Sequence, residues 1–289
     1  MTILLKGKPV ADKLNEKTKK RVAALQEYGV TPCLATLRVG ERPDEIAYEK
    51  GTSKRCADVG IEVVHTVLPE EAKQGEVEAH LERLNQDERV HGIIIFSPLP
   101  QHLDLNRVRM LLNPQKDVDG VTDGSHSKMY SGYGHGFAPC TAQSCIEMLQ
   151  YHKIDLRGKH VVVIGRSLVV GKPLAQLLLR RDATVTVCHS RSRNIEQFTQ
   201  SADIIVVAAG KPGLITRDHL GKDQVIIDVG INWNDATQSL CGDVDFDAVK
   251  DEVAAISPVP GGVGSITTSM LVANVVSAAY EHAKEIGVL

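Results

Sequence analysis

The sequence predicts an α/β protein in which two α/β domains flank a cleft, the second domain containing a Rossmann-like parallel sheet. Three observations support this fold class. Short apolar segments of strand length alternate with longer amphipathic segments along the chain. A glycine-containing turn directly follows one of the most apolar segments, as in Rossmann folds. The chain of 289 residues is also long enough for two domains of modest size.

The first half of the chain predicts one set of alternating helices and strands. Residues 10–28 are amphipathic and end at Gly29, which is typical of a helix and its C-cap. The other expected helices are residues 43–54 and 76–87, and the expected strands are residues 33–39, 61–68 and 90–96. This alternation favours a parallel sheet with helices on its faces.

The second half predicts a second such unit. Residues 114–139 are rich in Gly, Ser and His with little periodicity, and we interpret them as the connection between the domains and part of the cleft floor. Helices are expected over residues 141–152 and about 268–286. The expected strands are residues 160–164, 184–188, 204–208 and 225–229, spaced as in a Rossmann fold.

Composition and charge exclude several classes of function. Apolar residues make up 43% of the chain, and the formal net charge of −3 gives no electrostatic case for binding nucleic acid or an anionic membrane. The N-terminal apolar segment is too short for a signal peptide, and no apolar run reaches membrane-spanning length. The six cysteines are scattered, with no C-x-x-C pair, which suits a reducing compartment and makes a metal site unexpected. We therefore expect a soluble, cytoplasmic protein with no metal.

A nucleotide site is expected after the strand at residues 160–164. Gly165 and Gly171 are small residues at positions where a backbone can approach a pyrophosphate, at the start of a helix. The spacing differs from G-x-G-x-x-G, so the motif alone is weak. The strand at residues 184–188 ends in hydroxyl and guanidinium side chains and lacks the acidic residue of an NAD site. These side chains suit a 2′-phosphate, although the same stretch could be a solvated turn. Together the two features favour NADP.

Several motifs carry a resemblance to a known family. They are G-R-S-x-x-V-G-x-P at residues 165–173, K-D-V-D-G at residues 116–120 and P-V-P-G-G-V-G at residues 258–264. With these motifs, almost the whole chain resembles the bifunctional methylenetetrahydrofolate dehydrogenase/methenyltetrahydrofolate cyclohydrolase family. The resemblance implies a folate-binding catalytic domain (residues 1–139 plus 268–289) and an NADP-binding Rossmann domain (residues 140–267). It also implies a homodimer formed through the NADP domain.

The resemblance assigns roles to individual residues. Tyr48 acts on the reduced folate, and Asp119 holds the pterin ring, a task that suits a carboxylate because it accepts paired N–H bonds. The expected substrate-binding residues are Tyr48, Asp119, Pro260, Gly261 and Gly262. The expected cofactor-binding residues are Gly165, Arg166, Ser167, Gly171, Pro173, His189, Ser190, Arg191, Ser192, Gly210, Gly230 and Ile231.

The sequence departs from the family pattern at positions expected to be catalytic. Thr52 stands where the family has a lysine, and Phe96 where it has a glutamine; Ala142 and Ser265 replace prolines of two other motifs. Residues four apart share a helix face, so Lys50 and Lys54 point away from Tyr48. One of the eleven histidines could replace the lysine only if the fold brings it to Tyr48.

The two reactions of the family depend differently on these side chains. Hydride transfer mainly requires alignment of two rings, whereas hydrolysis needs groups that activate water and move protons. We therefore predict a dehydrogenase with weak or lost cyclohydrolase activity. Two alternatives stay open: an NADP oxidoreductase that acts on a different pterin or one-carbon carrier, and a non-catalytic NADP- or folate-binding paralogue.

Overall fold

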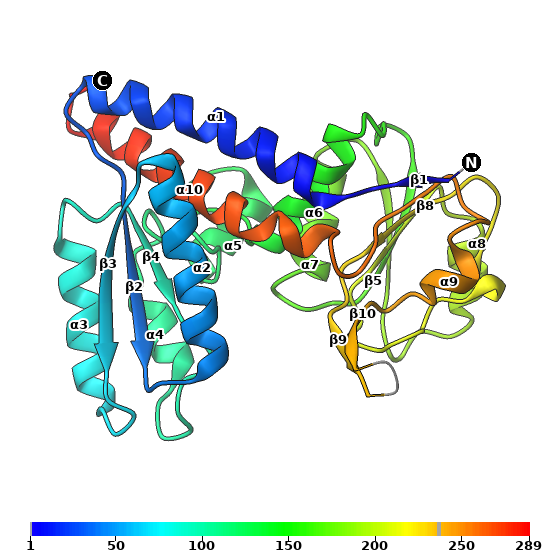
Figure 1. Ribbon diagram of the computed structural model, residues 1–289, viewed down its shortest axis with the longest axis horizontal. Helices are drawn as coiled ribbons and strands as arrows, with labels where there is room; N and C mark the ends of the chain where they lie inside the picture. The colour runs from blue at the N-terminus through cyan, green and yellow to red at the C-terminus, as the bar shows by residue number, and fades with distance from the viewer. Residues whose placement is uncertain (1, 236–237) are drawn as a thin grey trace. The chain divides into compact units, whose positions relative to one another are not determined.

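The computed structural model, which describes residues 2–235 and 238–289, divides into two compact α/β units (Figure 1). The first unit consists of Lys13–Cys140 and Thr268–Leu289, and the second consists of the chain up to Asp12 together with Thr141–Thr267. The predicted α/β fold class is confirmed. In these parts of the chain, no helix has both the length and the apolar character needed to cross a membrane.

The first unit is built on a parallel sheet of three strands in the order β3-β2-β4. The strands are β2 (Cys33–Val39), β3 (Glu62–Leu68) and β4 (Gly92–Ile95). Every residue of the central strand β2 is buried, as expected for a strand covered on both faces. The helices of this unit are α1 (Gly7–Glu27, which begins in the second unit), α2 (Pro43–Val59), α3 (Gln74–Gln86), α4 (Leu105–Leu111), α5 (Asp123–Ser131) and α10 (Thr267–Glu285).

Helix α2 positions most of the candidate catalytic side chains. It begins with Pro43, whose fixed backbone suits the first helical position, and it ends at Gly60, which adopts a left-handed conformation with φ 86°. Its buried side chains are spaced three or four residues apart: Glu45, Glu49, Thr52, Cys56 and Val59. This spacing is the stripe of a helix that packs on a sheet.

The second unit contains a parallel sheet of six strands in the order β1-β11-β8-β7-β5-β6. Its strands are β5 (His160–Ile164), β6 (Thr184–Cys188), β7 (Ile204–Val207), β8 (Val225–Asp228), β11 (Ala255–Ile256) and β1 (Ile3–Leu4). The remaining elements are α6 (Cys140–Tyr151), α7 (Gly171–Leu179), α8 (Ile195–Gln200), α9 (Phe246–Val249), η1 (Arg217–His219), η2 (Val263–Ser265) and the hairpin β9 (Asn232–Asn234)–β10 (Ser239–Cys241). The four strands predicted for this unit are confirmed. The strand order changes direction between β5 and β7, which is where open α/β sheets bind ligands.

Two features differ from the sequence prediction. The prediction placed residues 1–139 in the first domain, but β1 pairs with β11, so the chain up to Asp12 belongs to the second unit. The stretch 114–139, expected to be irregular, contains helix α5. This helix is capped by Thr122, whose hydroxyl accepts a hydrogen bond from the Ser125 amide at 3.1 Å. A two-residue strand and a short polar helix leave too little periodicity to be recognised in a sequence.

Candidate active site

The first unit has a cavity of about 230 Å³ at the carboxyl end of β4. The structure brings the predicted residues Tyr48, Phe96 and Asp119 together there. The full lining is Asp44, Glu45, Tyr48, Ile94, Ile95, Phe96, Ser97 and Asp119. We refer to this cavity as the Tyr48 pocket. Its place at the ends of parallel strands is the usual position of a ligand site in this architecture.

Tyr48 is held so that its phenol stays protonated. Its ring meets the Phe96 ring edge to face, with 6.1 Å between the centroids and 79° between the planes. Burial of the hydroxyl raises the pKa of Tyr48 well above its usual value, and the nearby Asp119 raises it further. The side chain still exposes 42% of its surface. Tyr48 can therefore donate a hydrogen bond to a ligand but cannot act as a base near neutral pH.

Thr52 occupies the predicted place beside Tyr48, although it does not line the cavity. It lies one helical turn further along α2 and is only 1% exposed. Its hydroxyl sits close enough to the phenol to lower the pKa of Tyr48 slightly, yet its Oγ1 makes no hydrogen bond of good geometry in the described residues. Lys50 and Lys54 are exposed, and neither lines the Tyr48 pocket. None of the eight described lining residues is a histidine, so no histidine replaces the family lysine there.

Asp119 is a carboxylate whose pKa is raised by its surroundings. Burial raises the pKa of Asp119 to about 6, and the negative charge of Asp117 adds to the effect. Asp117 itself is fully buried and accepts hydrogen bonds from the hydroxyls of Thr122 (2.7 Å) and Ser125 (2.6 Å). The two aspartates of K-D-V-D-G thus differ: Asp117 holds the following loop in place, and Asp119 faces the Tyr48 pocket.

Glu45 is a lining residue that the sequence argument missed. It belongs to the first turn of α2 and is 5% exposed. Burial raises the pKa of Glu45 above its ordinary value. The missed signal was spacing, because Glu45 precedes Tyr48 by three residues and so shares its helix face. A glutamate at such a position is normally assumed to be solvated.

The second unit has a cavity of about 510 Å³ at the carboxyl ends of β5, β6 and β7. It contains the predicted residues Gly165, Arg166, Ser167, His189, Ser190 and Ser192, together with Ile164, Ile195, Ala208, Ala209, Lys211 and Leu214. The lining combines polar and cationic side chains with apolar ones. No carboxylate occurs among these described lining residues, which fits a ligand that carries phosphates.

The turn of this cavity requires its glycines. Gly165 has φ 124°, and a Cβ there would lie 2.2 Å from the Ala208 carbonyl oxygen. A Cβ on Gly171 would lie 2.0 Å from the Gly165 carbonyl oxygen. Gly171 and Pro173 are buried in the first turn of α7 and do not line the cavity. They instead allow the helix to start close to the strand, which leaves a cradle for an anion.

The turn after β6 is organised by its own side chains. The His189 amide donates to Ser192 Oγ at 3.0 Å, and the Arg191 amide donates to His189 Nδ1 at 3.1 Å. The side chain of Arg191 is exposed and lies outside the cavity lining. His189 and Ser192 therefore shape the turn, and Arg191 is available to a ligand group that extends beyond the cavity.

Asp243 is a further residue that the sequence did not reveal. Its buried carboxylate accepts three successive backbone N–H groups, from Ala209 (2.6 Å), Gly210 (2.9 Å) and Lys211 (2.8 Å). It also accepts from Asn232 Nδ2 at 2.9 Å. The predicted residue Gly210 thus has its amide engaged by protein. Asp243 fixes the loop after β7 that forms one wall of the cavity.

Replacing Asp243 by asparagine is expected to lower the free energy of unfolding by about 1–3 kcal/mol, because the new NH₂ group would face buried N–H donors. Affinity for the expected dinucleotide should fall as well, since Ala209 and Lys211 line its cavity. Chemical denaturation and a nucleotide titration measure the two effects. Asp247→Asn, at a side chain 86% exposed, is the control and should change neither. Equal effects of both variants would contradict this view of Asp243.

A third cavity, of about 220 Å³, also lies in the second unit and contains the remaining predicted residues. It brings Gly230 and Ile231, which follow β8, together with Pro260, Gly261 and Gly262. A Cβ on Gly230 would lie 2.3 Å from Asp243 Oδ1, so this position also needs glycine. These two loops are 30 residues apart in the sequence but form one wall of a single site.

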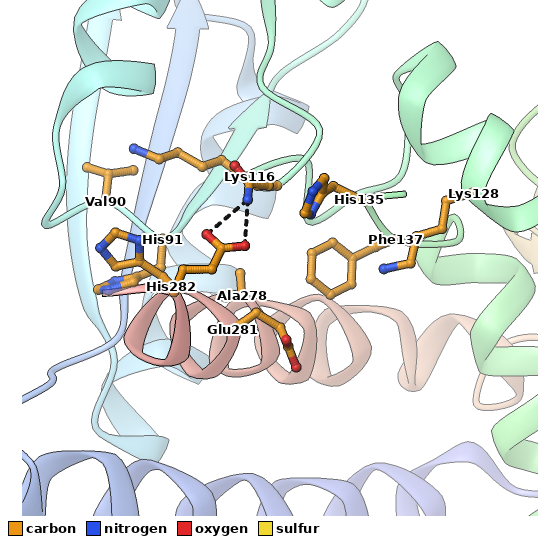
Figure 2. A pocket seen from close by; sticks show the side chains of 12 residues that line it. Val90, His91, Lys116, Lys128, His135, Phe137, Ala278, Glu281 and His282 are labelled. Carbon is orange, nitrogen blue, oxygen red and sulfur yellow. Dashed lines mark hydrogen bonds between the residues drawn. The ribbon is translucent and has the colours of Figure 1, made fainter. Parts of the chain in front are cut away.

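A small cavity of about 70 Å³ lies near the amino end of β4, away from the Tyr48 pocket (Figure 2). Its lining mixes both charge signs, with Lys116, Lys128, Glu281 and Glu285 among its members. No group of three or more His, Cys, Asp or Glu in the described parts of the chain is arranged to hold a metal ion. We therefore assign no metal-binding role to this cavity.

The histidine pair in this cavity predicts a pH dependence of stability. His91 is 6% exposed, and its ring lies 5.5 Å from that of His282. Figure 2 shows the two rings next to each other. Burial, with His282 and Lys116, lowers the pKa of His91 from 6.5 to about 4. The unfolded chain takes up this proton near pH 6.5, whereas the folded chain does so only near pH 4. The stability that this histidine contributes is therefore complete above pH 6.5 and is lost as the pH falls toward 4.

Between pH 7 and pH 5, protonation of His91 should cost the unmodified chain about 2 kcal/mol of its free energy of unfolding. The variant His91→Asn should not show this part of the loss. Asparagine can still accept the hydrogen bond that His91 Nδ1 accepts from the Cys33 amide at 3.2 Å. Urea unfolding at both pH values measures the difference. The exposed His135, in the same cavity, provides the control His135→Asn, which should follow the unmodified chain. If His91→Asn loses as much stability between the two pH values as the unmodified chain, this histidine does not titrate as described.

Both parts of the chain match family models. Residues 5–119 match "Tetrahydrofolate dehydrogenase/cyclohydrolase, catalytic domain", and residues 139–283 match "Tetrahydrofolate dehydrogenase/cyclohydrolase, NAD(P)-binding domain". Among curated relatives, the bifunctional protein FolD of Carboxydothermus hydrogenoformans is 46% identical over 275 residues, which cover 95% of this chain and 96% of that protein.

Solved structures agree with these matches. The bifunctional enzyme FolD, methylenetetrahydrofolate dehydrogenase/cyclohydrolase, from Campylobacter jejuni has a TM-score of 0.93 at 37% identity, over 97% of this chain and 99% of that chain. The methylenetetrahydrofolate dehydrogenase-cyclohydrolase of Trypanosoma brucei, solved with NADP and an inhibitor, has a TM-score of 0.89 at 33% identity, over 97% of this chain and 98% of that chain. The resemblance stated from the sequence motifs is confirmed.

Proposed function

The chain belongs to the tetrahydrofolate dehydrogenase/cyclohydrolase family, and from this premise we propose that it is an NADP-dependent 5,10-methylenetetrahydrofolate dehydrogenase with weak or no cyclohydrolase activity. One observation carries the proposal. The Tyr48 pocket brings Tyr48 and Asp119 together, and the buried Thr52 stands at the position where the sequence resemblance expects a lysine. The pocket thus keeps groups that bind and align a pterin and lacks the cation expected to assist hydrolysis.

In this proposal the pocket binds the reduced folate through its flat ring. Asp119, when ionised, accepts two N–H bonds from the aminopyrimidinone edge. The rings of Tyr48 and Phe96, packed edge to face, offer an aromatic surface to the pterin. The protonated Tyr48 phenol donates a hydrogen bond that helps to orient the one-carbon bridge. These contacts position the bridge for loss of a hydride, which is mainly a problem of alignment.

The second unit supplies the cofactor site in this proposal. The tight turn at Gly165 and Gly171 leaves room for a pyrophosphate at the start of α7, because the missing side chains let the helix begin close to the strand, where a Cβ would collide with a backbone carbonyl oxygen. Arg166, Ser190 and the exposed Arg191 are placed to bind phosphate groups, including a 2′-phosphate. When bound, NADP accepts the hydride and is reduced. A structural relative solved with NADP supports this choice of cofactor.

Hydrolysis is expected to be weak because the pocket lacks the group that would help Tyr48. The phenol keeps its proton near neutral pH, and Thr52 carries no charge and no base of suitable pKa. Phe96 offers no hydrogen bond where the family has a glutamine. A different pterin or one-carbon carrier stays the second candidate, since the buried Glu45 and Phe96 give this pocket an acidic and aromatic lining.

We also propose that the protein acts in the cytoplasm and forms a homodimer. Both proposals follow from the family resemblance. Light scattering of the purified protein would test the dimer.

The proposed function is tested by two absorbance assays on one purified sample. The first follows NADP reduction with methylenetetrahydrofolate, and the second follows decay of methenyltetrahydrofolate without nucleotide. Reduction with decay at the buffer rate supports a monofunctional dehydrogenase. Decay well above the buffer rate contradicts the loss of cyclohydrolase. Neither activity, with folate still bound, would indicate the non-catalytic paralogue or a different carrier.

A further inference from the structure

The Tyr48 pocket carries an unusual concentration of negative charge. Three of its eight described lining residues are carboxylates, Asp44, Glu45 and Asp119, and none of the eight is Lys, Arg or His. Two aromatic rings, two isoleucines and a serine make up the rest of the described lining. Carboxylates and aromatic faces both favour a positive charge held between them. The pocket therefore suits a ligand that is, or becomes, cationic.

Glu45 contributes a charge that the protein neutralises poorly. Its side chain is 6% exposed, and its nearest cationic group is the Arg42 guanidinium, with 3.9 Å between Nε and Oε1. Arg42 is committed elsewhere, because its NH2 and Nε groups bind Asp44 at 2.7 and 3.3 Å. Within the described residues, no hydrogen bond joins the Glu45 carboxylate to a protein donor of good geometry. A buried carboxylate with so few hydrogen bonds and ion pairs destabilises the fold unless a bound ligand balances its charge.

The other charged groups around Glu45 do not remove this imbalance. Arg38, on β2, pairs with Glu49 at 3.3 Å and also donates to the Gly40 carbonyl oxygen. Asp44 and Glu49, on the same helix, add negative charge. Among the described residues, Arg109 is the cation that acts on Asp119 and lowers its pKa. The carboxylate thus lies in an environment that favours a cation in the pocket.

The two reactions of the family change the charge of the substrate bridge in opposite directions. In dehydrogenation, a C–H bond of the neutral methylene bridge breaks and its electron pair passes as hydride to NADP⁺. The bridge carbon is oxidised and becomes part of a methenyl cation whose charge spreads over N5 and N10. In hydrolysis, water adds to that carbon, a proton leaves and one C–N bond breaks, so the cation disappears. An anionic wall favours the first step and disfavours the second.

We propose that Glu45 is a specificity-determining residue that stabilises the methenyl cation in the Tyr48 pocket and so biases this enzyme toward dehydrogenation and away from hydrolysis. The inference rests on the proposed function and deepens it. It attributes the bias toward dehydrogenation to Glu45, in addition to the replacement of the expected lysine by Thr52. The first turn of α2 holds the charge in a fixed place, because helix geometry and burial leave Glu45 little freedom.

The test compares binding of methenyltetrahydrofolate, which carries the cationic bridge, with binding of tetrahydrofolate, which has neither the bridge nor its charge, in the absence of nucleotide. Methenyltetrahydrofolate and tetrahydrofolate are titrated into the unmodified chain and into Glu45→Gln, with protein fluorescence recorded in the first seconds after mixing. The unmodified chain should bind methenyltetrahydrofolate about tenfold more tightly than tetrahydrofolate. Glu45→Gln should lose most of this preference and keep its tetrahydrofolate affinity within about twofold. It should also hydrolyse methenyltetrahydrofolate no more slowly than the unmodified chain.

A matched control removes the same charge from the same helix. Asp58 is exposed and lies thirteen residues beyond Glu45, about 20 Å at ~1.5 Å per residue, so Asp58→Asn should leave both affinities unchanged. Thermal melting checks the fold, and Glu45→Gln should melt at the same temperature or higher because it removes a buried charge.

The outcomes separate the inference from the proposed function. Equal weakening of both ligands in Glu45→Gln would mean that the side chain only shapes the pocket, and slower hydrolysis in that variant would make it a general base. Either result overturns the inference and leaves the dehydrogenase standing. Failure of both ligands to bind the unmodified chain would overturn the proposed function and the inference with it.

Discussion

Introducing lysine at Thr52 and glutamine at Phe96 together is expected to raise the hydrolysis of methenyltetrahydrofolate by about 10²–10⁴-fold, the usual contribution of positioned acid–base groups. Thr52 is buried beside the Tyr48 phenol, whose raised pKa now keeps it protonated. An ammonium group at that place would lower the pKa of Tyr48 and supply a proton donor. Methenyltetrahydrofolate absorbance without nucleotide measures the gain.

The variant Thr52→Met separates charge from volume. Methionine fills similar space without a cation and should leave hydrolysis at the level of the unmodified chain. Melting temperatures of both variants guard against loss of the fold, since lysine at a site only 1% exposed costs stability. If the unmodified chain already hydrolyses the substrate rapidly and Tyr48→Phe abolishes this, another group assists Tyr48 and the helix-face argument is wrong.

Replacing Asp119 by asparagine is expected to abolish measurable folate binding while it stabilises the fold. The carboxylate costs stability at neutral pH because burial raises its pKa to about 6, above the ordinary 3.8. The expected gain in free energy of unfolding is about 1–3 kcal/mol at pH 7. For a raised carboxylate pKa, this gain shrinks as the pH falls through 6 toward 3.8, because both the folded and the unfolded chain then carry the proton.

Ligand titration and urea unfolding of the same preparations test the two halves of this expectation. An asparagine cannot accept two N–H bonds from the pterin edge, so affinity should fall even though the fold is more stable. In the unmodified chain, folate affinity should decline below about pH 6, when Asp119 takes up its proton. The exposed Asp123 supplies the control Asp123→Asn. An Asp119 variant that keeps full affinity would remove this aspartate from the site.

Much of the fold and cofactor site could be predicted from local patterns. The strands at residues 160–164 and 184–188 have the predicted bounds. Both are short runs rich in valine, and such runs are visible in the sequence alone. Gly165 and Gly171 were expected where the backbone approaches closely. A Cβ added to either residue would lie 2.2 or 2.0 Å from a backbone carbonyl oxygen. Tyr48 and Thr52 could be placed on one face because helical spacing is a local property.

Other features were decided only by the tertiary structure. The pairing of β1 with β11 joins segments about 250 residues apart. A strand of two residues is too short to show the hydrophobic periodicity that would predict it. The Asp243 carboxylate holds three amides of a loop more than thirty residues earlier in the chain. The burial of Glu45, beneath a pocket with no cation in its described lining, depends on how α2 lies on its sheet. The sequence by itself determined the family motifs, the strands and the helix faces, because these follow from neighbouring residues. The burial, charge state and pKa of the site side chains were decided by the tertiary structure, because solvation depends on which distant segments exclude water from a side chain.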